Sequence, residues 1–181
     1  MITRSLAILL LPLLITITPF KKEESIPWSA ERRLVWDDFK GKPDGNSGNA
    51  ALTSSGIEFG YRYGDQTFSF TITCMFDKNK SWGRVKTDYI LAHEQGHFDV
   101  SEIHARKLYK ALKAYKVNQS TLAKDVQAIY SQLMKEQSEM QNVYDDETDN
   151  SRNKEKQAAW LKKINKELEQ LKDYAGYRQG A

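Results

Sequence analysis

The stretch TDYILAHEQGHFDVSEIHARKLYKALKAY, from Thr87 to Tyr115, decides how this chain divides into elements. Thr87 is a favourable N-cap, and Asp88 follows it in the first turn. No proline occurs after Pro43, so nothing breaks a helix that starts here. The stretch therefore predicts one long amphipathic helix. Its buried face is expected to carry Ile90, His93, His97, Val100, Leu108 and Tyr115.

Residues 93–97 of this helix read HEQGH and match the pattern H-E-x-x-H. His93 and His97 are one turn apart, so their imidazoles lie on one face, about 6 Å apart along the axis, and can share a tetrahedral zinc ion. Glu94 lies roughly 100° round the helix, where it can reach a metal-bound water without binding the metal. We predict His93 and His97 as metal ligands and Glu94 as the catalytic base. A pair of surface histidines beside Glu94 is the alternative, but buried imidazoles on an apolar face need partners.

His104 shares this face, but in a straight helix its Cα lies about 10 Å beyond that of His97. The metzincin pattern would need glycine at position 100 and histidine at position 103, where this chain has Val100 and Ile103. We therefore predict His104 as a packed core histidine, and as a ligand only if the helix bends.

Three charged residues of the same helix have expected places away from the metal. Glu102 and Arg106 are four residues apart and are predicted to pair on the outer face of the helix. Asp99 is expected either to make such a surface pair or to orient a ligand histidine.

The sequence before this helix has the period of β-strands. Ile57 to Tyr63 and Phe68 to Phe76 each alternate apolar with polar residues around Gly64 and Asp65, which predicts an antiparallel hairpin with one apolar face. The segment at 40–49, KGKPDGNSGN, is a loop by composition.

The sequence after the helix predicts two more helices. Ser120 is expected to cap the first of them, whose apolar stripe runs from Leu122 to Val143. Residues 145–151, DDETDNS, are predicted as a loop, and a third helix then runs to about Tyr174. The order indicates an α+β fold, a small antiparallel sheet followed by three helices, with a zincin-like active-site helix. We expect one domain over 21–181, with a β-rich part at 27–82 and a helical part at 87–174.

A catalytic zinc site commonly has three protein ligands, and only two histidines are suitably spaced here. We predict Asp145 as the third ligand, because a loop after the second helix can turn its carboxylate back toward the first. Asp149 is the nearest competitor, His104 remains open if the helix bends, and Asn150 offers at best a weak amide oxygen.

The first twenty residues differ from the rest of the chain. Arg4 precedes an uncharged apolar run from Leu6 to Ile17, and charged residues end it, which is typical of a secretory signal peptide at 1–20. An uncleaved N-terminal anchor is the alternative. We therefore predict an exported protein, periplasmic or secreted, that touches the membrane only through such an anchor. Cys74 is the only cysteine, and we expect it to be a buried core residue.

The net charge of +3 comes from 27 basic and 24 acidic side chains that are well mixed along the chain. Nothing in this distribution suggests a nucleic-acid surface.

Several stretches together resemble a bacterial family of unknown function whose members are described as predicted secreted zinc-dependent proteases. The resemblance implies the same zinc-bound H-E-x-x-H helix. In one place the chain departs from the family pattern, which continues with His-Gly where this chain has Asn150 and Ser151. The departure implies either that Asp145 completes the site or that the site is degenerate. The matching stretches are LVWDDFKGKP (34–43), FDKNKSW (76–82), LAHEQGHFDVSEIHAR (91–106) and YDDET (144–148), continued by Gln157, Trp160 and Ile164.

These features predict an exported zinc metallopeptidase that acts on a peptide or protein substrate. A peptide of the cell envelope is one such substrate. The first alternative is a noncatalytic exported module that binds metal or a partner through a degenerate site. A second is an envelope interaction protein built on the Lys- and Glu-rich helices from Arg152 onward. Glu94 favours the enzyme, because a binding module has no reason to keep a carboxylate beside the ligands.

Overall fold

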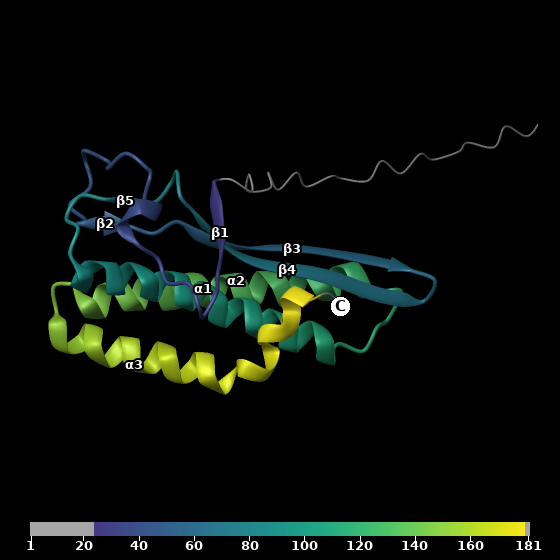
Figure 1. Cartoon of the computed structure of the whole chain (residues 1–181). Helices are drawn as coiled ribbons and strands as arrows, with labels where there is room; N and C mark the ends of the chain where they lie inside the picture. Colours follow the sequence, from purple (N-terminus) through teal and green to yellow (C-terminus); the bar gives the residue numbers. More distant parts are fainter. Residues whose placement is uncertain (1–23, 180–181) are drawn as a thin grey trace, which may run out of the picture.

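The computed structural model describes residues 24–179, in which a layer of strands lies over a layer of helices (Figure 1). The predicted signal peptide at 1–20 lies outside these residues. Within 24–179, no helix combines the length and the apolar character needed to cross a membrane.

The order of elements confirms the predicted α+β arrangement, a small antiparallel sheet with three main helices. The strands are β1 (Ser25–Pro27), β2 (Ala51–Leu52), β3 (Ser55–Gly64), β4 (Thr67–Asp77) and β5 (Trp82–Gly83). The helices are η1 (Trp36–Asp38), α1 (Asp88–Ala114), α2 (Leu122–Thr148), α3 (Lys154–Gln170) and η2 (Lys172–Gln179), of which η1 and η2 are 3₁₀ helices.

The predicted hairpin is formed by β3 and β4, with Ile57 opposite Cys74 and Tyr63 opposite Phe68. Its turn is one residue later than expected, at Asp65 and Gln66, both of which have positive φ. Two such residues make a turn whose twist matches that of the paired strands. Strand β1 adds to the other edge of β4, and β2 pairs separately with β5.

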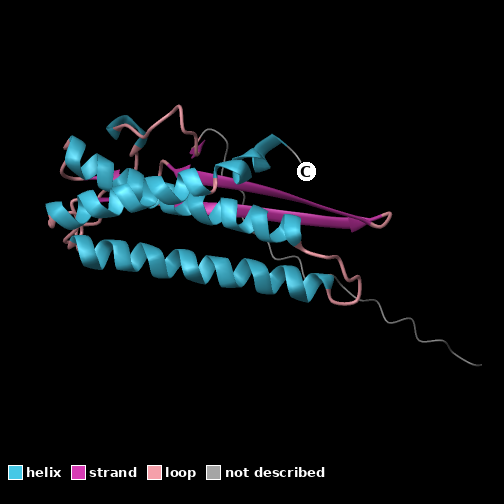
Figure 2. Cartoon of the chain, turned by 90° about the horizontal axis from the view of Figure 1, so that it is seen from below, coloured by secondary structure: helices cyan, strands magenta, loops and turns pink. Residues whose placement is uncertain are grey.

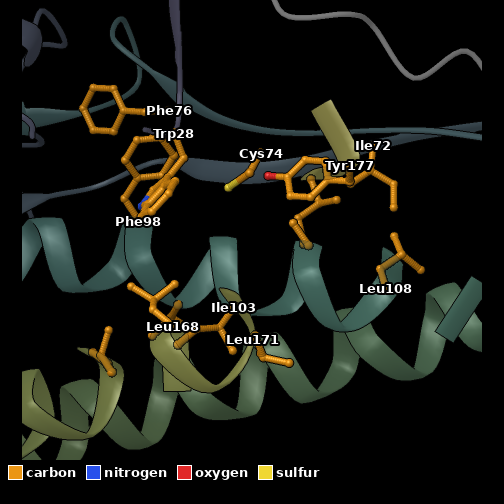
Figure 3. Packing of buried hydrophobic residues seen from close by; sticks show 14 of the residues in the cluster. Trp28, Ile72, Cys74, Phe76, Phe98, Ile103, Leu108, Leu168, Leu171 and Tyr177 are labelled. Atoms are coloured by element: carbon orange, nitrogen blue, oxygen red, sulfur yellow. The ribbon is translucent and has the colours of Figure 1, made fainter. Parts of the chain in front are cut away.

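Seen from below, the helices lie in front of the strands, and the tip of the hairpin reaches past the helix ends (Figure 2). The core fills the space between the sheet and α1, where Trp28, Phe76 and Phe98 meet, and continues between α1 and α3 at Ile103 and Leu168 (Figure 3). Cys74 is fully buried in this core, as predicted. Helix α1 is therefore covered on several sides.

This covering overturns the predicted surface pair of Glu102 and Arg106. Both side chains are buried, with Arg106 Nε 2.9 Å from Glu102 Oε1. Tyr177 of η2 donates a hydrogen bond to the other Glu102 oxygen, and Arg106 donates to the backbone carbonyl of Leu168. The pair lies beneath α3 and η2, so the outer face inferred from α1 alone does not exist in the fold.

Candidate metal centre and its cleft

Helix α1 begins as predicted, because the Thr87 side chain accepts a hydrogen bond from the backbone N–H of Ile90. The helix has no break over Asp88–Ala114, so the H-E-x-x-H residues keep helical spacing. His93 and Glu94 are each only 3% exposed, and His97 is partly buried. The two imidazoles lie edge to face with their centroids 4.8 Å apart.

Asp145 meets both histidines. One of its carboxylate oxygens lies 3.2 Å from His93 Nε2 and 3.0 Å from His97 Nε2, and the two nitrogens are 3.1 Å apart. These three residues form a group that could hold a metal ion. We expected Asp145 to lie in a loop. It lies instead in the last turn of α2, which continues to Thr148.

The donor set fits a zinc ion. Bonds of about 2.0–2.2 Å at tetrahedral angles place ligand atoms roughly 3.4 Å apart, close to the three separations observed. Two imidazole nitrogens and one carboxylate oxygen are also common ligands of catalytic zinc. Within the described part of the chain, no fourth His, Cys, Asp or Glu joins this group.

Gln141 orients His97 and was not anticipated from the sequence. Its side-chain oxygen lies 2.6 Å from His97 Nδ1, and its amide nitrogen donates to the His97 carbonyl oxygen at 2.9 Å. A proton held on Nδ1 leaves the Nε2 lone pair free for a metal. Gln141 precedes Asp145 by one turn of α2, and this spacing was the signal that could have found it.

Replacing Gln141 with Leu should weaken zinc affinity about 10- to 100-fold, because an outer partner that fixes the histidine tautomer is lost. Competition with a chromogenic chelator measures this affinity. Gln132→Leu is the matched control, since Gln132 is an exposed residue of the same helix whose side chain donates to Glu136, away from the ligand group. Equal affinities in the two variants would contradict the role of Gln141.

The Tyr144 ring packs against the rings of both His93 and His97. It is fully buried, stacks on the His93 ring at 4.5 Å and donates a hydrogen bond to the His93 carbonyl oxygen. Gly96 makes this contact possible, because a Cβ at that position would lie 2.6 Å from the Tyr144 hydroxyl oxygen. The glycine within HEQGH is therefore a site of close helix approach.

Gly96→Ala should lower the free energy of unfolding by about 1–3 kcal/mol, since the added methyl overpacks a buried contact. The better helix propensity of Ala offsets at most about 1 kcal/mol. Urea denaturation of the single and double variants measures the effect. Adding Tyr144→Phe removes the nearest atom, so the loss should be smaller in that background. An equal loss in both backgrounds would show that Tyr144 is not the obstacle.

The charges of the centre act on one another. Burial alone lowers the pKa of His97, but the hydrogen bond and charge of Asp145 outweigh it and the pKa is raised. Burial alone raises the pKa of Asp145, yet its hydrogen bonds from His93 and His97 hold the pKa far below its usual value. The carboxylate is therefore ionised and available as a ligand.

Glu94 differs from Asp145, because burial raises its pKa above the usual value despite the neighbouring His97 and a hydrogen bond from Thr53. Its Oε2 atom is buried and has no hydrogen-bond partner among the described residues. Thr53 also donates to the Glu94 backbone carbonyl, which ties the β2 region to α1 at this point. Glu94 thus has one acceptor atom without a hydrogen-bond partner among the described residues, beside the ligand group.

The centre opens into a cleft of about 340 Å³. One wall is the chain around β2, from Asn49 to Ser55, and the other is the face of α2 from Met134 to Asp145. Asn150 and Ser151 line it where α2 ends. Both have positive φ. The Thr148 hydroxyl stabilises this turn, because it donates a hydrogen bond to the Tyr144 carbonyl and accepts one from the Ser151 amide.

The other candidate residues lie elsewhere. His104 is buried and bonds the Val100 carbonyl through Nδ1, as predicted for a core histidine. Asp149 is exposed and pairs with Arg152. Asp99 is buried, where it accepts hydrogen bonds from Trp28 and Gln95 and pairs with Arg33, so it orients neither ligand histidine.

A family model of bacterial proteins of unknown function, DUF922, matches residues 38–153. The match covers well over half of the chain. The protein belongs to this family. The matched DUF922 segment holds His93, Glu94, His97 and Asp145 and ends before α3. No curated protein and no solved structure gave a match.

Proposed function

We propose that this DUF922 protein is an exported, zinc-dependent hydrolase of the metallopeptidase type, with α1 as a zincin-like active-site helix. The observation that carries the proposal is the position of Glu94. It is a buried carboxylate with one oxygen that has no hydrogen-bond partner among the described residues, next to the group of three ligand residues that line the same cleft. A site that only held a metal would not need this extra acid.

His93, His97 and Asp145 would hold the zinc ion through Nε2, Nε2 and one carboxylate oxygen. Zinc supplies Lewis acidity that polarises a carbonyl and lowers the pKa of a bound water to about 7. Gln141 and Tyr144 keep the two imidazoles in place, so little reorganisation is needed during reaction.

Glu94 takes the proton from the attacking water and passes it to the leaving amine. The burial of Glu94 keeps competing water away from the carboxylate.

The wall at β2 provides backbone groups for an extended substrate. Leu52 is paired with Trp82, and the Ala50 carbonyl accepts from the Arg84 amide. Bonding alternates along an antiparallel pair, so the backbone groups of Ala51 point away from β5. Ala51 lines the cleft, where these groups can bond a peptide chain by strand addition.

The test uses protein produced from the full-length sequence and purified from the periplasm and the medium. We expect about one zinc per chain. We also expect cleavage of a mixed peptide library that stops on chelation and returns with zinc. Zinc without cleavage would favour a noncatalytic metal-binding module, and absence from both fractions would contradict export.

A further inference from the structure

The residues that line the cleft indicate which kind of substrate it can bind, an inference that rests on the proposed function. Apart from the metal centre and Glu94, every lining residue is uncharged. Hydroxyl and amide side chains dominate, with two alanines, Leu52 and Met134 as the apolar members. Within the described residues, no lysine or arginine lines this cleft.

Charge recognition at a chain end needs a counter-charge. An enzyme that trims carboxyl-terminal residues must bind a carboxylate, and one that trims amino-terminal residues must bind an ammonium group. Glu94 and Asp145 are the only carboxylates in the lining; Asp145 belongs to the ligand group, and Glu94 is the proposed base. A charged terminus that entered here would lose its hydration without gaining an ion pair.

The cleft is also long enough for a chain segment. The lining residues of α2 run from Met134 to Asp145, about three helical turns or roughly 16 Å. That length matches roughly five residues of extended peptide. Hydrogen bonds link the two walls of the cleft through α1. The Ser101 hydroxyl lies 2.8 Å from the Ser55 hydroxyl and accepts a hydrogen bond from Gln137 at 2.8 Å.

We infer that the cleft takes the interior of an uncharged polypeptide segment, so the protein cuts internal peptide bonds flanked by neutral side chains. Most contacts are made on one side of the cut bond. Asp145 stands at the end of the α2 wall, and the turn at Asn150 and Ser151 bounds the cleft just beyond it. The longer part of the substrate lies along α2 toward Met134.

A defined peptide mixture tests this inference. Peptides of about 14 residues, longer than the roughly five that the cleft holds, are made with free and with blocked termini and incubated with the zinc-loaded protein. Mass spectrometry identifies each cut. We expect internal cuts at equal rates in both sets, with Asp, Glu, Lys and Arg depleted beside the cut bond.

A charge introduced into the wall gives a second test. Ser138 is exposed and lines the cleft, whereas Ser131 is an exposed residue of the same helix outside it. Ser138→Lys should improve cutting of peptides with Asp or Glu near the cut bond about twofold to fivefold relative to neutral peptides. Ser131→Lys should leave the profile unchanged.

The outcomes separate the inference from the proposed function. Stepwise loss of terminal residues, or a preference for free termini, would overturn the inference and leave the hydrolase standing. An unchanged profile in Ser138→Lys would overturn the placement of the substrate along α2. If zinc is bound and no peptide is cut, both fail together.

Discussion

Replacing Glu94 with Gln should leave zinc content unchanged and reduce peptide hydrolysis about 10²- to 10⁴-fold, the usual contribution of a general base. Gln has the same shape but cannot take a proton from water. The side chain is not one of the three grouped ligand residues, so the metal site should survive. Cleavage of the best library peptide measures the rate, and elemental analysis measures the zinc.

Glu139→Gln is the matched control for this variant. Glu139 is an exposed residue of α2 that pairs with Lys135 on the surface. It should keep the parent rate and stability. If Glu94→Gln cut as fast as this control, Glu94 would not be the base and the proposed mechanism would fail.

His93→Ala and His97→Ala should each abolish stoichiometric zinc binding. Each change removes one of three grouped ligand atoms and leaves Asp145 without one of its two imidazole partners. Dialysis against micromolar free zinc followed by elemental analysis gives the content. His104→Ala is the control on the same helix, because this histidine bonds the Val100 carbonyl and is not one of the grouped ligand residues.

Asp145→Ala should weaken zinc binding by at least the 10- to 100-fold typical of losing an outer partner, since a direct ligand is removed. Asp149→Ala is its control, because Asp149 is exposed and faces Arg152. A loss of zinc in Asp149→Ala or in His104→Ala, with Asp145→Ala unaffected, would show that the third ligand is another residue.

The sequence alone determined the parts of the protein that depend on local periodicity. The helix from Thr87, the hairpin of β3 and β4 and the shared face of His93 and His97 follow from repeats of two or 3.6 residues. Each needs only a few consecutive residues to be visible. The same spacing placed Glu94 beside the ligand pair.

The sequence was a weaker guide at the end of α2. The run DDETDNS has the composition of a loop, because Asp, Asn and Ser favour turns. Burial of Tyr144 and Thr148 against the rest of the fold overrides that preference and extends the helix through Asp145. The prediction of Asp145 as a ligand is therefore compatible with the structure, although the loop from which it was inferred is a helical turn.

Only the tertiary structure decided which residues complete the centre. Asp145 lies 52 residues from His93, and Gln141 lies 44 residues from His97. No local repeat links positions so far apart, so their meeting depends on how α2 packs on α1. That packing in turn depends on Gly96 leaving room for Tyr144. Helical periodicity fixes atoms within one element, whereas the contact between elements is a property of the folded core.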